Sequence, residues 1–172
     1  MGIVQKVSLI SYLLILGFAL GGQPLLGCAY GAGWKNKIRE ILSFEMKICM
    51  SVAIMLTLAV EIFAPVIMSL FINDPEIISL GKDMLRIQYC ATVFQAFVLV
   101  VFSLGISFGD ARTPFILSIS RQGIIFIIAI VILARLFGYF GVISAQPAAD
   151  LITAFVAFFL LKRRLRVRLA NI

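Results

Sequence analysis

Histidine is absent from this 172-residue sequence, and charged residues make up only 13% of it. The first absence removes the commonest metal ligand and the commonest acid–base catalyst. Cysteine is scarce, and its three residues, Cys28, Cys49 and Cys90, stand far apart on apolar segments. This spacing fits neither a disulfide framework nor a metal site, so we expect small core residues there. We therefore predict a protein that is not an enzyme and that holds no metal and no cofactor.

Apolar residues, by contrast, make up 62% of the sequence, more than a soluble domain of this length can bury in one core. Apolar runs of about 20 residues can cross a bilayer as helices. Five such runs occur, at 7–27, 48–71, 87–108, 114–134 and 141–161. We predict an all-α, polytopic membrane bundle of about five transmembrane helices, with the lipid bilayer as its solvent.

The basic residues lie mostly at the ends of these runs, and cytoplasmic loops are enriched in Lys and Arg. If the runs alternate in direction, one side receives ten of them: Lys35, Lys37, Arg39, Lys47, Arg112, Lys162, Arg163, Arg164, Arg166 and Arg168. The other side receives only Lys6, Lys82, Arg86 and Arg135. We therefore expect a cytoplasmic C-terminus and, with five spans, an N-terminus outside.

The net charge of +7 then reflects membrane orientation and does not indicate nucleic acid as a partner. The basic tail is an orientation anchor in this interpretation, although it would also suit anionic lipid. An odd number of spans with an outside start leads us to expect part of a longer membrane protein.

The connections between the runs are short. Asn73, Asp74 and Pro75 predict a turn or helix start within the main outer connection, 72–83. Residues 108–114 and 138–142 are predicted to form tight turns.

Two acids, Glu61 and Asp150, are expected deep in the bilayer, where an ionised side chain costs about 3 kcal/mol or more. Glu61 precedes Pro65 by four residues, so its carbonyl loses the helical partner and the helix is expected to bend there. A protonated Glu61 bonded to a neighbouring helix fits this pattern, and so does a site for water or an ion. Asp150 is expected to pair with Arg121, either as a structural pair or for gating or proton handling.

Polar stripes mark two further segments. Gln88, Thr92 and Gln95 follow helical spacing in the third run, and Gln146, Asp150 and Thr153 do so in the fifth. Such stripes serve either as hydrogen-bonding contacts between helices or as the wall of a substrate path. The candidate cavity residues are Glu61, Gln88, Gln95, Arg121, Gln146 and Asp150.

The stretch GGQPLLGCAYGAG (21–33) joins the first run to the basic segment. Pro24 frees the carbonyl of Leu20, which Gln23 is placed to satisfy, and GxxxG spacings allow close helix approach. Both a hinge and static tight packing fit this composition. The candidate hinge or packing residues are Gly21, Gln23, Pro24, Gly27, Gly31, Pro65 and Pro147.

The same stretch, followed by KNKIREIL, resembles a motif of the multidrug and toxic compound extrusion (MATE) family. APVIMSLFINDPEIISLGKDMLRI (64–87), FILSISRQGIIFI (115–127) and FGYFGVISAQPAADLITAFVAFFL (137–160) follow in the family's order. The family has twelve helices in two lobes, so residues 1–172 would form helices eight to twelve of the C-terminal lobe. The family's Gly-Tyr-Asn-Tyr-Gly is replaced by residues 27–31, Gly-Cys-Ala-Tyr-Gly.

The resemblance implies part of a secondary antiporter of the plasma (inner) membrane. It would export organic cations or amphipathic drugs in exchange for H+ or Na+ by alternating access. Its partners would be small organic substrates and a missing N-terminal lobe or partner subunit. The coupling site is not located, because the tenth helix offers Gln88 and Gln95 where some branches have an acid. The alternatives are a lipid-linked saccharide flippase of the same superfamily and a small membrane scaffold or assembly protein that transports nothing.

Overall fold

The computed structural model of the chain describes residues 2–71 and 74–170, with side chains up to Arg166. Every regular element in these ranges is helical, as the composition predicts. Asn73 of the predicted turn and the side chain of Arg168 lie outside the described residues. The elements are α1 (Gly2–Gly21), α2 (Gln23–Gly31), α3 (Lys35–Ser69), α4 (Pro75–Cys90), α5 (Thr92–Ser107), α6 (Arg112–Ile119), the π-helical turn η1 (Ser120–Ile124) and α7 (Ile125–Ala170).

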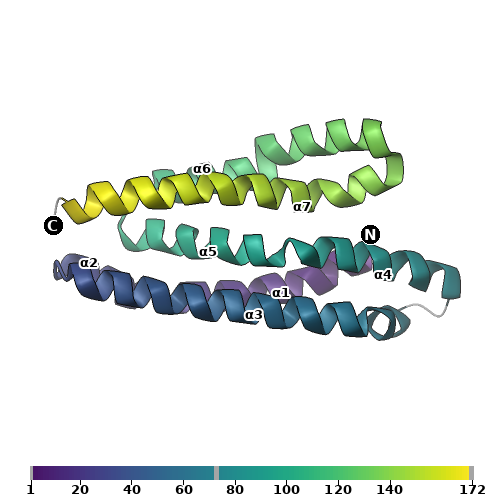
Figure 1. Ribbon diagram of the computed structural model, residues 1–172, viewed down its shortest axis with the longest axis horizontal. Coiled ribbons are helices and arrows are strands. Elements are labelled where there is room, and N and C mark those ends of the chain that lie inside the picture. The colour runs from purple at the N-terminus through teal and green to yellow at the C-terminus, as the bar shows by residue number, and fades with distance from the viewer. Residues whose placement is uncertain (1, 72–73, 171–172) are drawn as a thin grey trace.

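These elements form an elongated bundle of long rods (Figure 1). Among the described residues, three helical stretches have the length and apolar composition to cross a membrane: Gly2–Gly31, Lys35–Ser69 and Arg112–Arg166. A fourth is the pair α4 and α5, which are bent by 41° at the break between them. The third stretch reverses at Gly138, where φ is 55°, so it runs along the bundle and back. The predicted membrane bundle of about five spans is therefore confirmed.

The basic segments meet at one end of the bundle. In Figure 1 the turn between α2 and α3 lies at the left end, as does the C-terminus, while the N-terminus lies toward the right. Arg164 near the end of α7 forms an ion pair with Asp110 in the turn before α6, with 3.0 Å between Nε and Oδ2. This arrangement agrees with the alternation that the charge count assumed. That this end faces the cytoplasm stays a prediction.

Two of the segments between the apolar runs are largely helical, because the helices continue beyond those runs. The basic segment 28–47 is helical except at 32–34, since α3 begins at Lys35. The outer connection 72–83 is helical from Pro75, where the Asp74 side chain accepts a hydrogen bond from the Glu76 N–H at 3.0 Å. A helix satisfies its own backbone in water and in lipid alike, so a change in hydropathy does not mark where it ends.

Glycines end α2 and α5 in the same way. Gly33 and Gly109 have φ values of 72° and 63°, which other residues adopt only with strain. Beyond each glycine, the next N–H reaches back five residues: Trp34 to the Ala29 carbonyl (3.0 Å) and Asp110 to the Gly105 carbonyl (2.9 Å). This is the Schellman arrangement, which satisfies carbonyls at a helix end.

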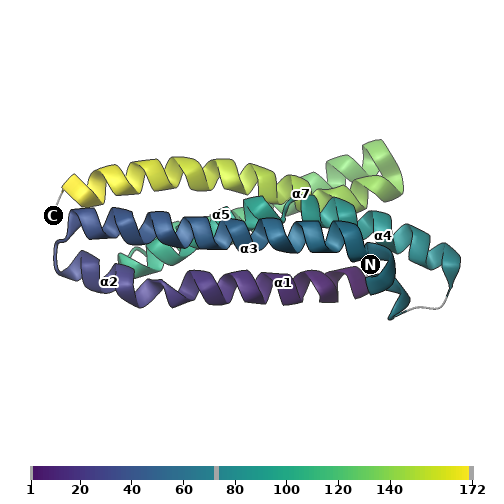
Figure 2. The same cartoon turned by 60° about the horizontal axis from the view of Figure 1, so that its bottom comes forward.

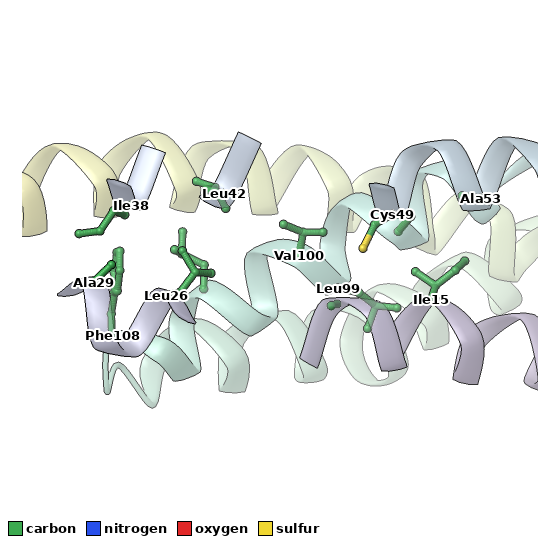
Figure 3. Close-up of a cluster of buried hydrophobic side chains, with 13 residues drawn as sticks. Ile15, Leu26, Ala29, Ile38, Leu42, Cys49, Ala53, Leu99, Val100 and Phe108 are labelled. Atoms are coloured by element: carbon green, nitrogen blue, oxygen red, sulfur yellow. The ribbon is translucent and has the colours of Figure 1, made fainter. Parts of the chain in front are cut away.

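The main core lies between α1 and α2 on one side and α3 and α5 on the other. Figure 2, turned by 60° from Figure 1, shows α1 and α3 lying side by side along most of their length. Figure 3 shows Ile15, Leu26, Cys49, Leu99 and Phe108 converging from α1, α2, α3 and the end of α5. The expectation of core cysteines holds for Cys49 alone, because Cys28 and Cys90 are exposed.

Three pairs of glycines have GxxxG spacing, Gly17 and Gly21, Gly27 and Gly31, and Gly105 and Gly109, and of these Gly105 is the one that another helix approaches closely. An added Cβ would meet nothing within 4 Å at Gly17, Gly21 or Gly31. At Gly105 it would lie 2.8 Å from Pro114 Cδ and 3.1 Å from Thr113 Cβ. Gly105 therefore sets the distance between α5 and the start of α6.

We predict that Gly105→Ala destabilises the chain by about 1–3 kcal/mol, because the new methyl group forces α6 away from α5. Thermal unfolding in detergent micelles measures the effect. Gly17→Ala is the matched control: it enters open space and removes a helix glycine, so it should not lower the melting temperature. Equal melting temperatures for the two variants would contradict the assigned packing.

Candidate functional site

A cavity of about 500 Å³ opens among α1, α4, the start of α5, η1 and α7. One part of its wall is apolar and includes Met84, Phe126 and Ile130. The polar part is rich in primary amides, which both donate and accept hydrogen bonds. The glutamines that contribute them are Gln5, Gln88, Gln95, Gln122 and Gln146.

An ion pair lies in the wall of this cavity. Arg121 Nε donates to Asp150 Oδ1 at 2.6 Å, and the two side chains are 11% and 6% exposed. The Gln146 side chain also hydrogen-bonds Asp150, and the Arg121 guanidinium lies 5.3 Å from the centre of the Tyr12 ring. Each charge thus has a partner, which removes much of the cost of carrying it into the bilayer.

The backbone around Arg121 departs from a regular α-helix. Residues 120–124 form the π-helical turn, and Gly123 adopts φ −108° and ψ −107°. Such turns are frequent at functional sites. Here the neighbouring residues Arg121 and Gln122 both reach the cavity wall.

Tyr89 fixes the opposite wall. Its hydroxyl lies 2.6 Å from the Ser11 hydroxyl and donates to the Val7 carbonyl at 3.1 Å. Tyr89 is 1% exposed as a residue, so this contact joins α4 to α1 within the core. The wall is held by packing as well as by hydrogen bonds.

The structure brings together most of the candidate cavity residues. Gln88, Gln95, Arg121, Gln146 and Asp150 all line the one cavity. Whether they contact a substrate stays a prediction.

Glu61 lies elsewhere, and its placement at the cavity was wrong. Its side chain is 36% exposed on the surface of α3 and forms an ion pair with Arg86 of α4 at 3.2 Å. Arg86 also donates to the Glu61 carbonyl at 3.2 Å. This is the carbonyl that Pro65 deprives of its helical partner. Glu61 therefore serves the contact between α3 and α4.

The candidate hinge residues fall into three groups. Gly21, Gln23 and Pro24 flank the junction between α1 and α2, whereas Pro65 and Pro147 lie inside helices that continue past them. Gly27 and Gly31 lie within α2.

At the junction between α1 and α2, Ser103 of α5 donates to the Ala19 carbonyl (2.7 Å) and Ser107 donates to the Gln23 carbonyl (3.2 Å). Bending at any of the candidate hinge residues stays a prediction.

Sequence reasoning missed Gln5 and Tyr12 of the cavity and the buried acid Glu45. The spacing of Gln5, Ser8 and Tyr12 is helical and could have revealed the first two. Glu45 lies in the basic segment ahead of the second apolar run, two residues before Lys47, so no apolar run pointed to it. The described residues hold no group of three or more acids and cysteines that could bind a metal.

The MatE family model matches residues 1–132 of this sequence. The chain belongs to the MatE family. A curated MatE-like relative, the multidrug export protein MepA of Staphylococcus haemolyticus (strain JCSC1435), is 24% identical over 99% of the chain and 38% of its own length. The chain thus spans well under half of that relative.

Solved structures show the same MatE fold. The MATE multidrug transporter DinF-BH, solved as a complex, is 30% identical, with a TM-score of 0.86 over 94% of the chain and 36% of that protein. A multidrug resistance MATE family transporter in an inward-facing conformation is 20% identical, with a TM-score of 0.89 over 96% of this chain and 39% of its own. One in an outward-facing conformation is also 20% identical, with a TM-score of 0.90 over 97% of this chain and 38% of its own.

We predict that Arg121→Gln and Asp150→Asn each destabilise this MatE chain by about 3 kcal/mol, because each leaves a buried charge without its partner. The double substitution should lose much less than the sum of the two. Thermal unfolding of the four proteins in micelles provides this double-mutant cycle. Additive losses would mean that the ion pair contributes nothing of its own.

Proposed function

We propose that this chain is part of the C-terminal lobe of a two-lobed efflux transporter in the plasma membrane. That transporter would export organic cations or amphipathic drugs in exchange for H+ or Na+. Membership of the MatE family supports this proposal, as do the relatives, which are multidrug transporters. A missing N-terminal lobe or partner subunit would complete the pathway between the two lobes.

The observation that carries the proposal is the composition of the cavity wall. Amides and the Arg121–Asp150 pair form its polar part, and apolar and aromatic side chains form the rest. An amphipathic compound matches such a wall, because its apolar body can pack against the apolar side chains while its polar groups bond to the amides. The ring of Phe126 in the same wall suits a cationic group on the compound.

Alternating access fits the comparisons with solved structures. The chain matches the inward-facing and outward-facing forms of one type of transporter about equally, with TM-scores of 0.89 and 0.90. A lobe that keeps its fold in both forms can rock as a unit against its partner. We propose this motion for the present chain.

A lipid-linked saccharide flippase is the weaker alternative. Its anionic substrate calls for unpaired cations in the cavity. Among the described residues, Arg121 is the only cation lining the 500 Å³ cavity, and Asp150 neutralises it. The scaffold alternative leaves the amide-rich cavity without a role.

We predict that Gln95→Leu lowers the apparent affinity for ethidium, a cationic and amphipathic dye, about five-fold, because one lost hydrogen bond is worth about 1 kcal/mol. The fluorescence of retained ethidium is measured in cells that express the protein carrying this chain. Asn36→Leu, at the exposed start of α3, is the matched amide control and should export like the wild type. Wild-type cells that retain as much ethidium as cells without the protein would contradict the proposed function for this compound.

A further inference from the structure

Glu45 is a buried acid that does not line the 500 Å³ cavity. It lies on α3, about 15 Å from the helix start at Lys35, and is 5% exposed. Figure 3 shows Leu42 and Cys49, its neighbours one turn away on the same helix face, pointing toward α1, α2 and α5. Glu45 therefore enters the main apolar core and not the amide-rich cavity.

Its carboxyl group has almost no polar neighbours. Neither of its oxygens accepts a hydrogen bond from the described residues, and both are shielded from solvent. The ion pairs among these residues are formed by Arg86, Arg121 and Arg164 with other acids. An unpaired carboxylate in such a place is far less stable than the neutral acid.

One neighbour suits the neutral acid and not the anion. The Ser103 hydroxyl of α5 faces Glu45, but it donates its single hydrogen to the Ala19 carbonyl at 2.7 Å. Its oxygen retains lone pairs that can accept a hydrogen bond. A protonated Glu45 can donate to Ser103, which in turn donates to Ala19.

The other titratable groups near this core are few. Cys49 lies one turn along α3, and Tyr12 of α1 and Tyr30 of α2 pack against the same cluster. α5 contains no titratable residue. From α7, Leu161 and Leu165 reach the cluster, while Arg164 pairs with Asp110.

The backbone beside Glu45 is the junction between α1 and α2. A Cβ added at Gly22 would lie 2.6 Å from Glu45 Oε2, so the carboxyl group rests against this glycine. Gly22 separates the two helices, and Pro24 follows in the first turn of α2. Separation of α2 from Glu45 at this junction would let water reach the carboxyl group.

We propose that Glu45 is a proton-binding site, closed while the acid is protonated and opened at the α1–α2 junction when it releases its proton to water. The O–H bond of the acid breaks, water takes the proton, and the anion gains hydration in place of Ser103. This inference rests on the proposed exchange of drug for H+ and assigns the proton to a residue of this chain.

Infrared difference spectra, acid minus alkaline, of the protein that carries this chain, in lipid, test the proposal directly. We expect a ¹³C-glutamate-sensitive carbonyl band at higher frequency than the bands of hydrated acids such as the exposed Glu40 and Glu76. This high-frequency band should vanish in Glu45→Gln and persist in Glu61→Gln, which alters the exposed acid paired with Arg86. A high-frequency glutamate band that survives in Glu45→Gln, or the lack of such a band in the wild type, would overturn the proposal.

Two further variants keep the test independent of whether Glu45→Gln folds. Ser103→Ala removes the acceptor, so the wild-type band should move to higher frequency. Gly22→Ala places a methyl group against the carboxyl oxygen, so the midpoint of the titration should change. An unchanged band in the first or an unchanged midpoint in the second would contradict the assigned contacts.

Two further measurements show which ion binds at Glu45 and whether this site and the proposed function fail independently. If Na+ at constant pH removes the band as alkali does, the site binds Na+ and the proton assignment is wrong. Ethidium export without a titrating Glu45 would overturn this site alone. A titrating Glu45 in a protein that does not export ethidium would support the site and contradict the proposed function for that compound.

Discussion

Hydrocarbon offers no hydrogen bonds, so each polar group that this chain carries into the bilayer must find its partner within the protein. That constraint explains the contacts at the helix irregularities. The Glu61 carbonyl, freed by Pro65, accepts from Arg86 of the next helix. Near the α1–α2 junction, the carbonyls of Ala19 and Gln23 accept from two serines one turn apart on α5. Both of these irregularities in the backbone are thus tied to side chains from another helix.

The same constraint separates the polar groups of the cavity from the proposed proton site. Arg121 and Asp150 satisfy each other, and the glutamines around them can hydrogen-bond one another, water or a ligand. Their wall is neutral and adaptable, which suits the proposed export of amphipathic compounds. Glu45 has no polar partner for either carboxyl oxygen, so its buried side chain is stable only in the protonated, neutral form. The first arrangement suits recognition, and the second suits coupling to a proton.

Most of the fold follows from apolar runs and turn residues that can be read from the chain. The five runs predict the rods, Asp74 predicts the start of α4, and the reversal at Gly138 lies in a predicted turn. Five cavity residues could be chosen in advance because an amide or a charge inside a span must face protein. Glu61 was misplaced because hydropathy gives depth along a helix but not which face is covered. Its actual partner, Arg86, was assigned to a helix end.

The sequence by itself determined that this chain is a helical membrane protein with a polar interior. Its apolar composition requires a lipid bilayer as solvent, and the helical spacing of its polar residues shows which face of each helix is turned toward protein. Its motifs also carried the resemblance to the family that the comparisons support. Only the tertiary structure decided that Gln5 and Tyr12 join the cavity, that Gly105 and not Gly17 is a close contact, and that Glu45 lies buried against Gly22. These facts depend on which rods are neighbours and how they are rotated, and no local pattern in a sequence encodes the distance between two helices.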